Sequence, residues 1–111
     1  MGISTHVLDT ATGRPAAGVG VRLERMRAGT WEVLSDAETD VDGRSGDLLG
    51  DSAAVERGVY RVRFETGAYF AAKGERCLYP FVEIVFEVMD ARHYHIPLLL
   101  TANGFTTYRG S

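Results

Sequence analysis

Two histidines near the end of this sequence stand two positions apart, in the run HYHIPLLL at residues 93–100. In an extended strand, His93 and His95 share one face, and the apolar residues at the even-numbered positions that follow form the other. His95 must therefore point away from the apolar layer. Such an imidazole is suited to work as a general base near neutral pH. Together with a third histidine elsewhere, the pair could also form a zinc site.

A turn signal, Asn103-Gly104, follows this strand and is itself followed by a second β-prone run at residues 105–108. Asn-Gly between two such runs is typical of a β-hairpin. We therefore expect a hairpin that returns the last residues, with their terminal carboxylate, toward the strand that carries the histidines. A polar tail held against a polar strand face predicts a site there.

Two further residues are candidate site residues, although each also has an ordinary structural interpretation. His6 lies on a short predicted strand over residues 3–8, where a single histidine most often only satisfies a backbone carbonyl. Arg44 follows the turn DVDG at residues 40–43, and a turn arginine is usually just solvated. Asp9, three positions beyond His6, falls on the opposite face of the strand and cannot orient it.

Other kinds of site find little support in the sequence. Ser111 has no Gly-x-Ser-x-Gly elbow around it, and Cys77 has no context that would lower its pKa. A single cysteine excludes an internal disulfide framework and a cysteine-rich metal cage. The net charge of −3 does not favour binding to nucleic acid or to an anionic membrane. No apolar run approaches the roughly 18 to 20 residues that span a bilayer, and no secretory signal is visible. We therefore expect a cytoplasmic protein, and the alternative is a mature periplasmic form whose signal has been removed.

Period-2 hydrophobic patterns dominate the chain and predict strands over residues 19–24, 59–65 and 81–88, among others. The one predicted helix covers residues 67–74, with Gly74 as its C-terminal cap. These elements indicate a single antiparallel β-sandwich domain over residues 1–111, with about seven or eight strands. The strand at residues 81–88 is apolar on both faces, which favours its burial by a partner chain.

The two ends of the chain resemble one known family. The runs STHVLDT at residues 4–10 and TGRPA at 12–16, together with HYHIPLLL and the terminal YRGS at 108–111, are similar to the transthyretin-related 5-hydroxyisourate hydrolases. The similarity extends over nearly the whole chain, and the two terminal motifs together are highly specific. The sequence departs from the family pattern at residues 45–47 and 105–107, outside the matched motifs.

The resemblance implies a transthyretin-like (prealbumin) β-sandwich that acts on a small-molecule substrate, without a cofactor or a metal. The implied reaction opens the six-membered ring of 5-hydroxyisourate to 2-oxo-4-hydroxy-4-carboxy-5-ureidoimidazoline, in urate degradation. It also implies a homotetramer, a dimer of dimers with sites at the subunit interface. The implied catalytic residues are His6, Arg44 and His95, and the implied substrate-binding residues are His6, Arg44, Tyr108, Arg109, Gly110 and Ser111.

One alternative function and one question about the site remain open. Transthyretin itself shares the fold but is a hormone-binding protein, so the chain could be a non-catalytic small-molecule carrier, and the fold cannot decide between the two. In the site, the resemblance gives a role to His95 and leaves His93 structural or solvated. Which of His6 and His95 is the general base stays open at this point.

Overall fold

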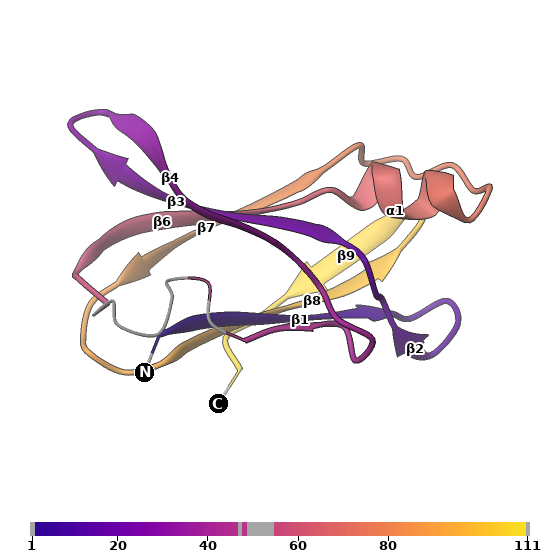
Figure 1. Cartoon of the computed structure of the whole chain (residues 1–111), viewed down its shortest axis with the longest axis horizontal. Helices are drawn as coiled ribbons and strands as arrows, with labels where there is room; N and C mark the ends of the chain where they lie inside the picture. Colours follow the sequence, from indigo (N-terminus) through magenta and orange to yellow (C-terminus); the bar gives the residue numbers. More distant parts are fainter. Residues whose placement is uncertain (1, 47, 49–54, 111) are drawn as a thin grey trace.

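Two β-sheets and one short helix make up the computed structural model, which describes residues 2–46, 48 and 55–110. Figure 1 shows the sheets as two layers, with the helix at one end of the molecule. Sheet A has the strand order β2-β1-β8-β9, and β5 pairs with β1 as well; sheet B has the order β4-β3-β6-β7. The strands of sheet A are β1 (Ile3–Asp9), β2 (Arg14–Pro15), β5 (Arg44–Ser45), β8 (Tyr94–Thr101) and β9 (Gly104–Thr107). The strands of sheet B are β3 (Gly20–Arg27), β4 (Thr30–Glu38), β6 (Gly58–Phe64) and β7 (Val82–Val88).

The period-2 patterns form the core between the sheets. On β6, Tyr60, Val62 and Phe64 are buried, as their alternation predicts. Arg61 and Arg63 lie on the outer face of sheet B, where they form ion pairs with glutamates of the same sheet. The all-β sandwich with one short helix is thus confirmed.

One strand pair differs from the predicted antiparallel arrangement. β1 and β8 run parallel, with Ser4 opposite His95 and His6 opposite Pro97, whereas the other strand pairs among the described residues are antiparallel. A tight hairpin would force two strands to be antiparallel, but these strands lie near opposite ends of the chain, so no hairpin constrains them. The pairing brings the two ends of the sequence together in the middle of sheet A.

The helix α1 (Thr66–Ala72) begins one residue before the predicted segment 67–74 and ends two residues before its end. The N–H groups of Gly74 and Glu75 donate back to the carbonyls of Ala71 and Phe70, which closes the helix where Gly74 was expected to end it. Among the described residues, no helix is long and apolar enough to cross a membrane. Leu48 is buried in a turn, in a Gly-, Asp- and Ser-rich segment whose composition predicts irregular structure with at most a short strand near Leu48-Leu49; Leu49 lies outside the described residues.

A buried carboxylate ties the helix to sheet A. The Asp9 side chain is 1% exposed and accepts hydrogen bonds from Lys73 Nζ at 2.9 Å and from the Tyr69 hydroxyl at 3.0 Å. The backbone N–H groups of Ala11 and Thr12 donate to its other oxygen. Burial raises the pKa of Asp9, but the hydrogen bonds from Lys73, Tyr69 and Thr12 lower it by more, and the pKa stays below its ordinary value.

We expect the Asp9→Asn variant to lose stability in a pH-dependent way. A depressed folded-state pKa means that the carboxylate stabilises the fold above its unfolded-state pKa, and that this contribution disappears as the pH falls through the folded-state pKa. The free energy of unfolding should drop by about 2 kcal/mol near neutral pH. The gap to the wild type should narrow as the pH is lowered from about 5 to about 3. Urea denaturation at several pH values measures this.

The matched control for this prediction is Asp36→Asn, which breaks the ion pair between Asp36 and Arg22. In this pair the Arg22 side chain is 47% exposed and the Asp36 side chain is 63% exposed. An exposed pair of this kind contributes at most about 1 kcal/mol. An Asp9→Asn variant as stable as the Asp36→Asn variant near neutral pH would contradict the anchoring role of Asp9.

Candidate active site

The three predicted catalytic side chains lie on one face of sheet A, the outer face that turns away from the core. Register places His6 opposite Arg44 on β5 and Ser4 opposite His95 on β8, and paired residues of neighbouring strands share a face. The alternate residues of β1, such as Val7, are buried in the core. The predicted orientation of His95, away from the apolar layer, is confirmed.

The turn before β5 fixes the position of Arg44. Asp40 Oδ1 accepts hydrogen bonds from the backbone N–H of Asp42 at 2.9 Å and of Arg44 at 3.0 Å. The hydrogen bond from Arg44 N–H is the main reason why the pKa of Asp40 lies below its ordinary value. Gly43 has φ +76°, and a Cβ there would lie 2.3 Å from the carbonyl oxygen of Val7. Only glycine allows the turn to approach β1 this closely.

The same turn orients His6. The Nε2 atom of His6 lies 2.8 Å from the backbone carbonyl oxygen of Asp42. A carbonyl oxygen can only accept, so the neutral imidazole carries its proton on Nε2 and donates it to Asp42. The Nδ1 atom of His6 is then left without a proton and can accept one.

His95 is held in its neutral form by its surroundings. It is half-buried, and its Nδ1 atom lies 2.8 Å from the Ser4 hydroxyl oxygen. Burial lowers the pKa of His95, and the positive charges of His6, His93 and Arg44 lower it further. A neutral imidazole at neutral pH is the form that a general base requires.

The chain end returns to His95 through the predicted hairpin. β9 pairs with β8, and beyond it the N–H of Gly110 donates to the carbonyl oxygen of His95 at 2.9 Å. A Cβ on Gly110 would lie 2.5 Å from the Cδ2 atom of the His95 ring. The tail is therefore in direct contact with the imidazole, as predicted. Ser111, also assigned to the site, lies outside the described residues.

We expect Gly110→Ala to impair the site without unfolding the protein, because the added methyl must displace either the tail or the His95 ring. A shift of about 1 Å at a reacting group can cost about 10²-fold in rate. Steady-state kinetics together with thermal unfolding measure the two effects separately. Gly46→Ala is the control, because a Cβ at Gly46 meets nothing within 4 Å. Equal activity of the two variants would contradict a tail that positions His95.

Tyr108 and Arg109 lie elsewhere than expected within one chain. The Arg109 guanidinium stacks on the Tyr94 ring, with its Cζ atom 4.1 Å from the ring centroid. With Tyr108, it lines a hollow of about 230 Å³ that also includes Phe86 of sheet B. The two side chains thus border the opening between the sheets and do not close over His6 and His95. Successive residues of an extended chain face opposite sides, and Arg109, which precedes Gly110 by one position, therefore points away from the side of Gly110.

The sequence analysis missed Ser4. Its hydroxyl oxygen lies 2.7 Å from His93 Nε2 and 2.8 Å from His95 Nδ1, so it joins the two histidines. His93 is exposed, in line with its assignment as structural or solvated, but it also contacts Ser4. The spacing of Ser4 and His6, two positions apart on one strand, was the signal that could have found it.

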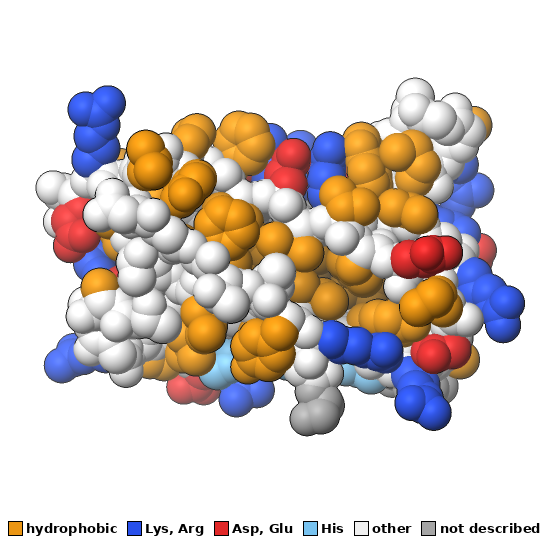
Figure 2. Space-filling view, turned by 180° about the vertical axis from the view of Figure 1, so that it is seen from behind, with side chains coloured by type: hydrophobic (Ala, Val, Ile, Leu, Met, Phe, Trp, Pro, Cys, Tyr) orange, Lys and Arg blue, Asp and Glu red, His pale blue; other side chains and the backbone are white. Residues whose placement is uncertain are grey.

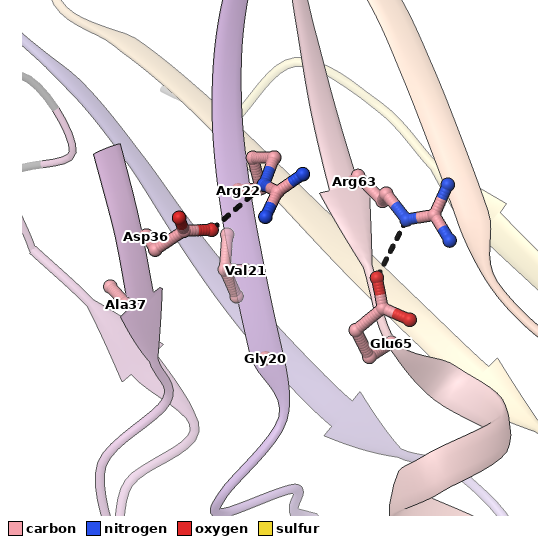
Figure 3. Close-up of a pocket in the computed structure, with 7 residues that line it drawn as sticks. All are labelled: Gly20, Val21, Arg22, Asp36, Ala37, Arg63 and Glu65. Atoms are coloured by element: carbon pink, nitrogen blue, oxygen red, sulfur yellow. Dashed lines mark hydrogen bonds and ion pairs between the residues drawn. The ribbon is translucent and has the colours of Figure 1, made fainter. Parts of the chain in front are cut away.

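A hollow of about 470 Å³ lies on sheet B and away from the histidines. Figure 3 shows its polar side chains paired with each other. Arg22 Nε donates to Asp36 Oδ1 at 2.8 Å, and Arg63 Nε donates to Glu65 Oε2 at 2.6 Å. With both arginines engaged, this hollow offers a ligand little beyond ordinary surface charge.

Metal binding was an alternative use of the histidines. Within residues 2–46, 48 and 55–110, no three His, Cys, Asp or Glu side chains are grouped closely enough to hold a metal ion. The residues described at the site instead offer two imidazoles, a guanidinium, a hydroxyl and the tail backbone. This set can bind an oxygen-rich molecule and transfer a proton.

Comparison with known proteins places this site in a family. A family model described as "HIUase/Transthyretin family" matches residues 3–110. The chain belongs to this family. Its site-bearing strands β1, β5 and β8 and the tail all lie inside the matched range.

Relatives within the HIUase/transthyretin family cover nearly the full chain. A probable 5-hydroxyisourate hydrolase of Schizosaccharomyces pombe is 43% identical over 98% of this chain and 90% of its own length. The 5-hydroxyisourate hydrolase of Mus musculus is 42% identical over 98% of this chain and 94% of its own length.

The similar solved structures include a 5-hydroxyisourate hydrolase and a thyroxine-bound transthyretin. The 5-hydroxyisourate hydrolase of Klebsiella pneumoniae superposes with a TM-score of 0.88 at 38% identity and covers 100% of both chains. Sea bream transthyretin in complex with thyroxine superposes with a TM-score of 0.92 at 30% identity and covers 99% of this chain and 95% of its own. Since the same fold is found in a 5-hydroxyisourate hydrolase and in a transthyretin that binds thyroxine, the fold alone does not decide the function and the side chains of the site must.

Proposed function

We propose that this protein is a hydrolase that opens the six-membered ring of 5-hydroxyisourate at an amide bond, in urate degradation. The observation that carries the proposal is the placement of His6, Arg44 and His95 on one face of sheet A, with the chain end held against His95. The relatives named as 5-hydroxyisourate hydrolases support the same substrate.

Water attacks the ring carbonyl in this reaction and must lose a proton as it does so. His6 offers an unprotonated Nδ1, because its Nε2–H is engaged by Asp42. His95 is a neutral imidazole at neutral pH. The two rings orient the water and accept its proton, and general base catalysis of this kind is worth about 10² to 10⁴ in rate.

The attack places negative charge on the carbonyl oxygen, and Arg44 stabilises it. The guanidinium is exposed on the outer face of sheet A beside His6, and its fork of donors also suits a flat ring rich in oxygen atoms. Substrate-binding roles for Tyr108, Arg109, Gly110 and Ser111 remain part of the proposal.

The proposed assembly is a homotetramer, a dimer of dimers with the sites at subunit interfaces. β7 and β9 are edge strands of their sheets, and large apolar side chains are exposed on or next to them: Phe81, Val85, Met89 and Phe105. Figure 2 shows hydrophobic side chains spread across the middle of the face seen from behind. Exposed apolar surface beside free strand edges favours association with further copies. Light scattering that reports a monomer at micromolar concentration would count against it.

One assay tests the reaction. Freshly generated 5-hydroxyisourate is followed by ultraviolet absorbance with and without the protein, and the absorbance is expected to decay faster with it. The alternative function is that of a non-catalytic carrier, and the similarity to thyroxine-bound transthyretin is the observation that favours it. A protein that leaves the decay unchanged but binds a hormone-type ligand would support the carrier and exclude the hydrolase.

A further inference from the structure

The Ser4 hydroxyl lies between two imidazole nitrogens. Its oxygen is 2.7 Å from His93 Nε2 and 2.8 Å from His95 Nδ1, both normal hydrogen-bond lengths. A hydroxyl has one proton, so it can donate to only one of two neutral rings and must accept from the other. The protonation of His93 Nε2 and that of His95 Nδ1 are therefore coupled through Ser4, one carrying a proton when the other does not.

The two rings that contact Ser4 differ in their exposure to solvent. Ser4 is buried, His95 is half-buried and His93 is exposed. An imidazolium is better solvated at the exposed position than at the half-buried one. A positive charge that arises on His95 is therefore more stable after it has moved to His93.

We propose that Ser4 and His93 are positioning residues that form, with His95, a proton relay from the site to solvent. The proposal rests on the proposed function, in which His95 takes a proton from water. His95 Nε2 gains that proton and its Nδ1 releases one to Ser4 Oγ. The hydroxyl proton of Ser4 passes to His93 Nε2, where the single positive charge is left to be given up to bulk water. The resting form has the proton of His95 on Nδ1 and keeps Nε2 free.

The charged groups around His95 favour movement of the proton outward. His6 on β1 and Arg44 on β5 face the same side of sheet A, and both disfavour a positive charge on His95. Gly110 contributes only backbone, through its hydrogen bond to the carbonyl of His95. On the His93 side, Arg109 Nη2 lies 3.5 Å from the His93 carbonyl oxygen, and exposure to solvent screens its charge.

The tautomers can be read without substrate by ¹⁵N NMR of the histidine rings. We expect the neutral His95 ring of the wild type to carry its proton on Nδ1, and titration of His93 to shift the His95 ring nitrogens. In Ser4→Ala, His95 should lose its fixed tautomer and this response. Ser4→Thr, which keeps the hydroxyl, should retain both. An Nε2–H tautomer for His95 in the wild type, or an unchanged spectrum in Ser4→Ala, would overturn the relay.

Kinetics supply a second readout in His93→Gln, an exposed substitution that keeps polar contact with Ser4 but cannot take up a proton. We expect kcat to fall about tenfold and KM to change by less than about twofold, because His93 acts through His95. Added imidazole buffer should restore kcat in His93→Gln, since it replaces the missing acceptor at the surface, but should not restore Ser4→Ala. Arg92→Gln, which removes a neighbouring exposed charge, is the control and should behave as wild type.

These measurements separate the relay from the reaction. If the wild type does not open 5-hydroxyisourate but the rings are coupled in the NMR titration, the proposed function fails and the coupling stands. If the wild type is active and His93→Gln has the wild-type kcat at every buffer concentration, the relay fails and the function stands.

Discussion

Replacement of His95 by alanine is expected to lower kcat for ring opening of 5-hydroxyisourate by about 10² to 10⁴-fold. The imidazole is half-buried, lies on the outer face of sheet A and has its Nδ1 atom 2.8 Å from the Ser4 hydroxyl oxygen. His6 should make up only part of the loss, because its ring is fixed by the Asp42 carbonyl, and His93 lies beyond Ser4. Stopped-flow absorbance under substrate saturation measures kcat.

The pH profile gives this prediction a second measurable part. Since burial and the charges of His6, His93 and Arg44 lower the pKa of His95, the active neutral form persists below the ordinary pKa of an imidazole. Activity should therefore be flat across neutral pH and fall only as the pH drops through this lowered pKa. Two results would contradict a role for His95 as the general base. One is a folded His95→Ala variant with the wild-type kcat, and the other is a wild-type activity that already falls above neutral pH as the pH is lowered.

Removal of the Arg44 guanidinium should have the second large effect. In Arg44→Ala, the charge that develops on the carbonyl oxygen loses its positive partner, and kcat/KM is expected to fall by about 10² to 10³-fold. Arg44→Lys should recover only part of this loss, because a lysine provides the charge without the planar fork of donors. The same absorbance assay, run at low substrate concentration, gives kcat/KM for each variant.

Arg14→Ala is the matched control for Arg44. Arg14 is an exposed arginine on β2, which pairs with β1 as β5 does. Its removal should leave kcat/KM unchanged within about a factor of two, the range usual for surface substitutions. If Arg44→Ala and Arg14→Ala proved equally active, the assignment of oxyanion stabilisation to Arg44 would be wrong.

Much of the site followed from local patterns. Alternation on β8 placed His95 opposite the apolar layer, and the Asn103-Gly104 signal produced the hairpin that brings Gly110 to His95. The Asp-Gly turn before Arg44 was also visible, because its residues form local hydrogen bonds among themselves. These features depend on residues that are close together in the sequence, so the amino-acid sequence alone is enough to predict them.

What escaped the sequence analysis depends on contacts between distant segments. The parallel pairing of β1 with β8 joins residues about ninety positions apart, and no local pattern reports its direction or register. Because this register sets Ser4 opposite His95, the link from Ser4 to both histidines could not be derived beforehand. The position of Arg109 on the Tyr94 ring was missed because the tail was treated as a unit, although successive residues face opposite sides.

Strand β1 has one more consequence, which concerns heritable variation in this protein. Its odd-numbered residues, such as Val7 and Asp9, face the interior, and its even-numbered residues Ser4 and His6 lie on the face of the proposed site. An inherited change on this strand therefore acts either on how much protein persists in the cell or on how fast each molecule works, according to the parity of its position. Within the seven residues of β1, substitutions at Ser4 and His6 should therefore change turnover, whereas those at Val7 and Asp9 should change stability.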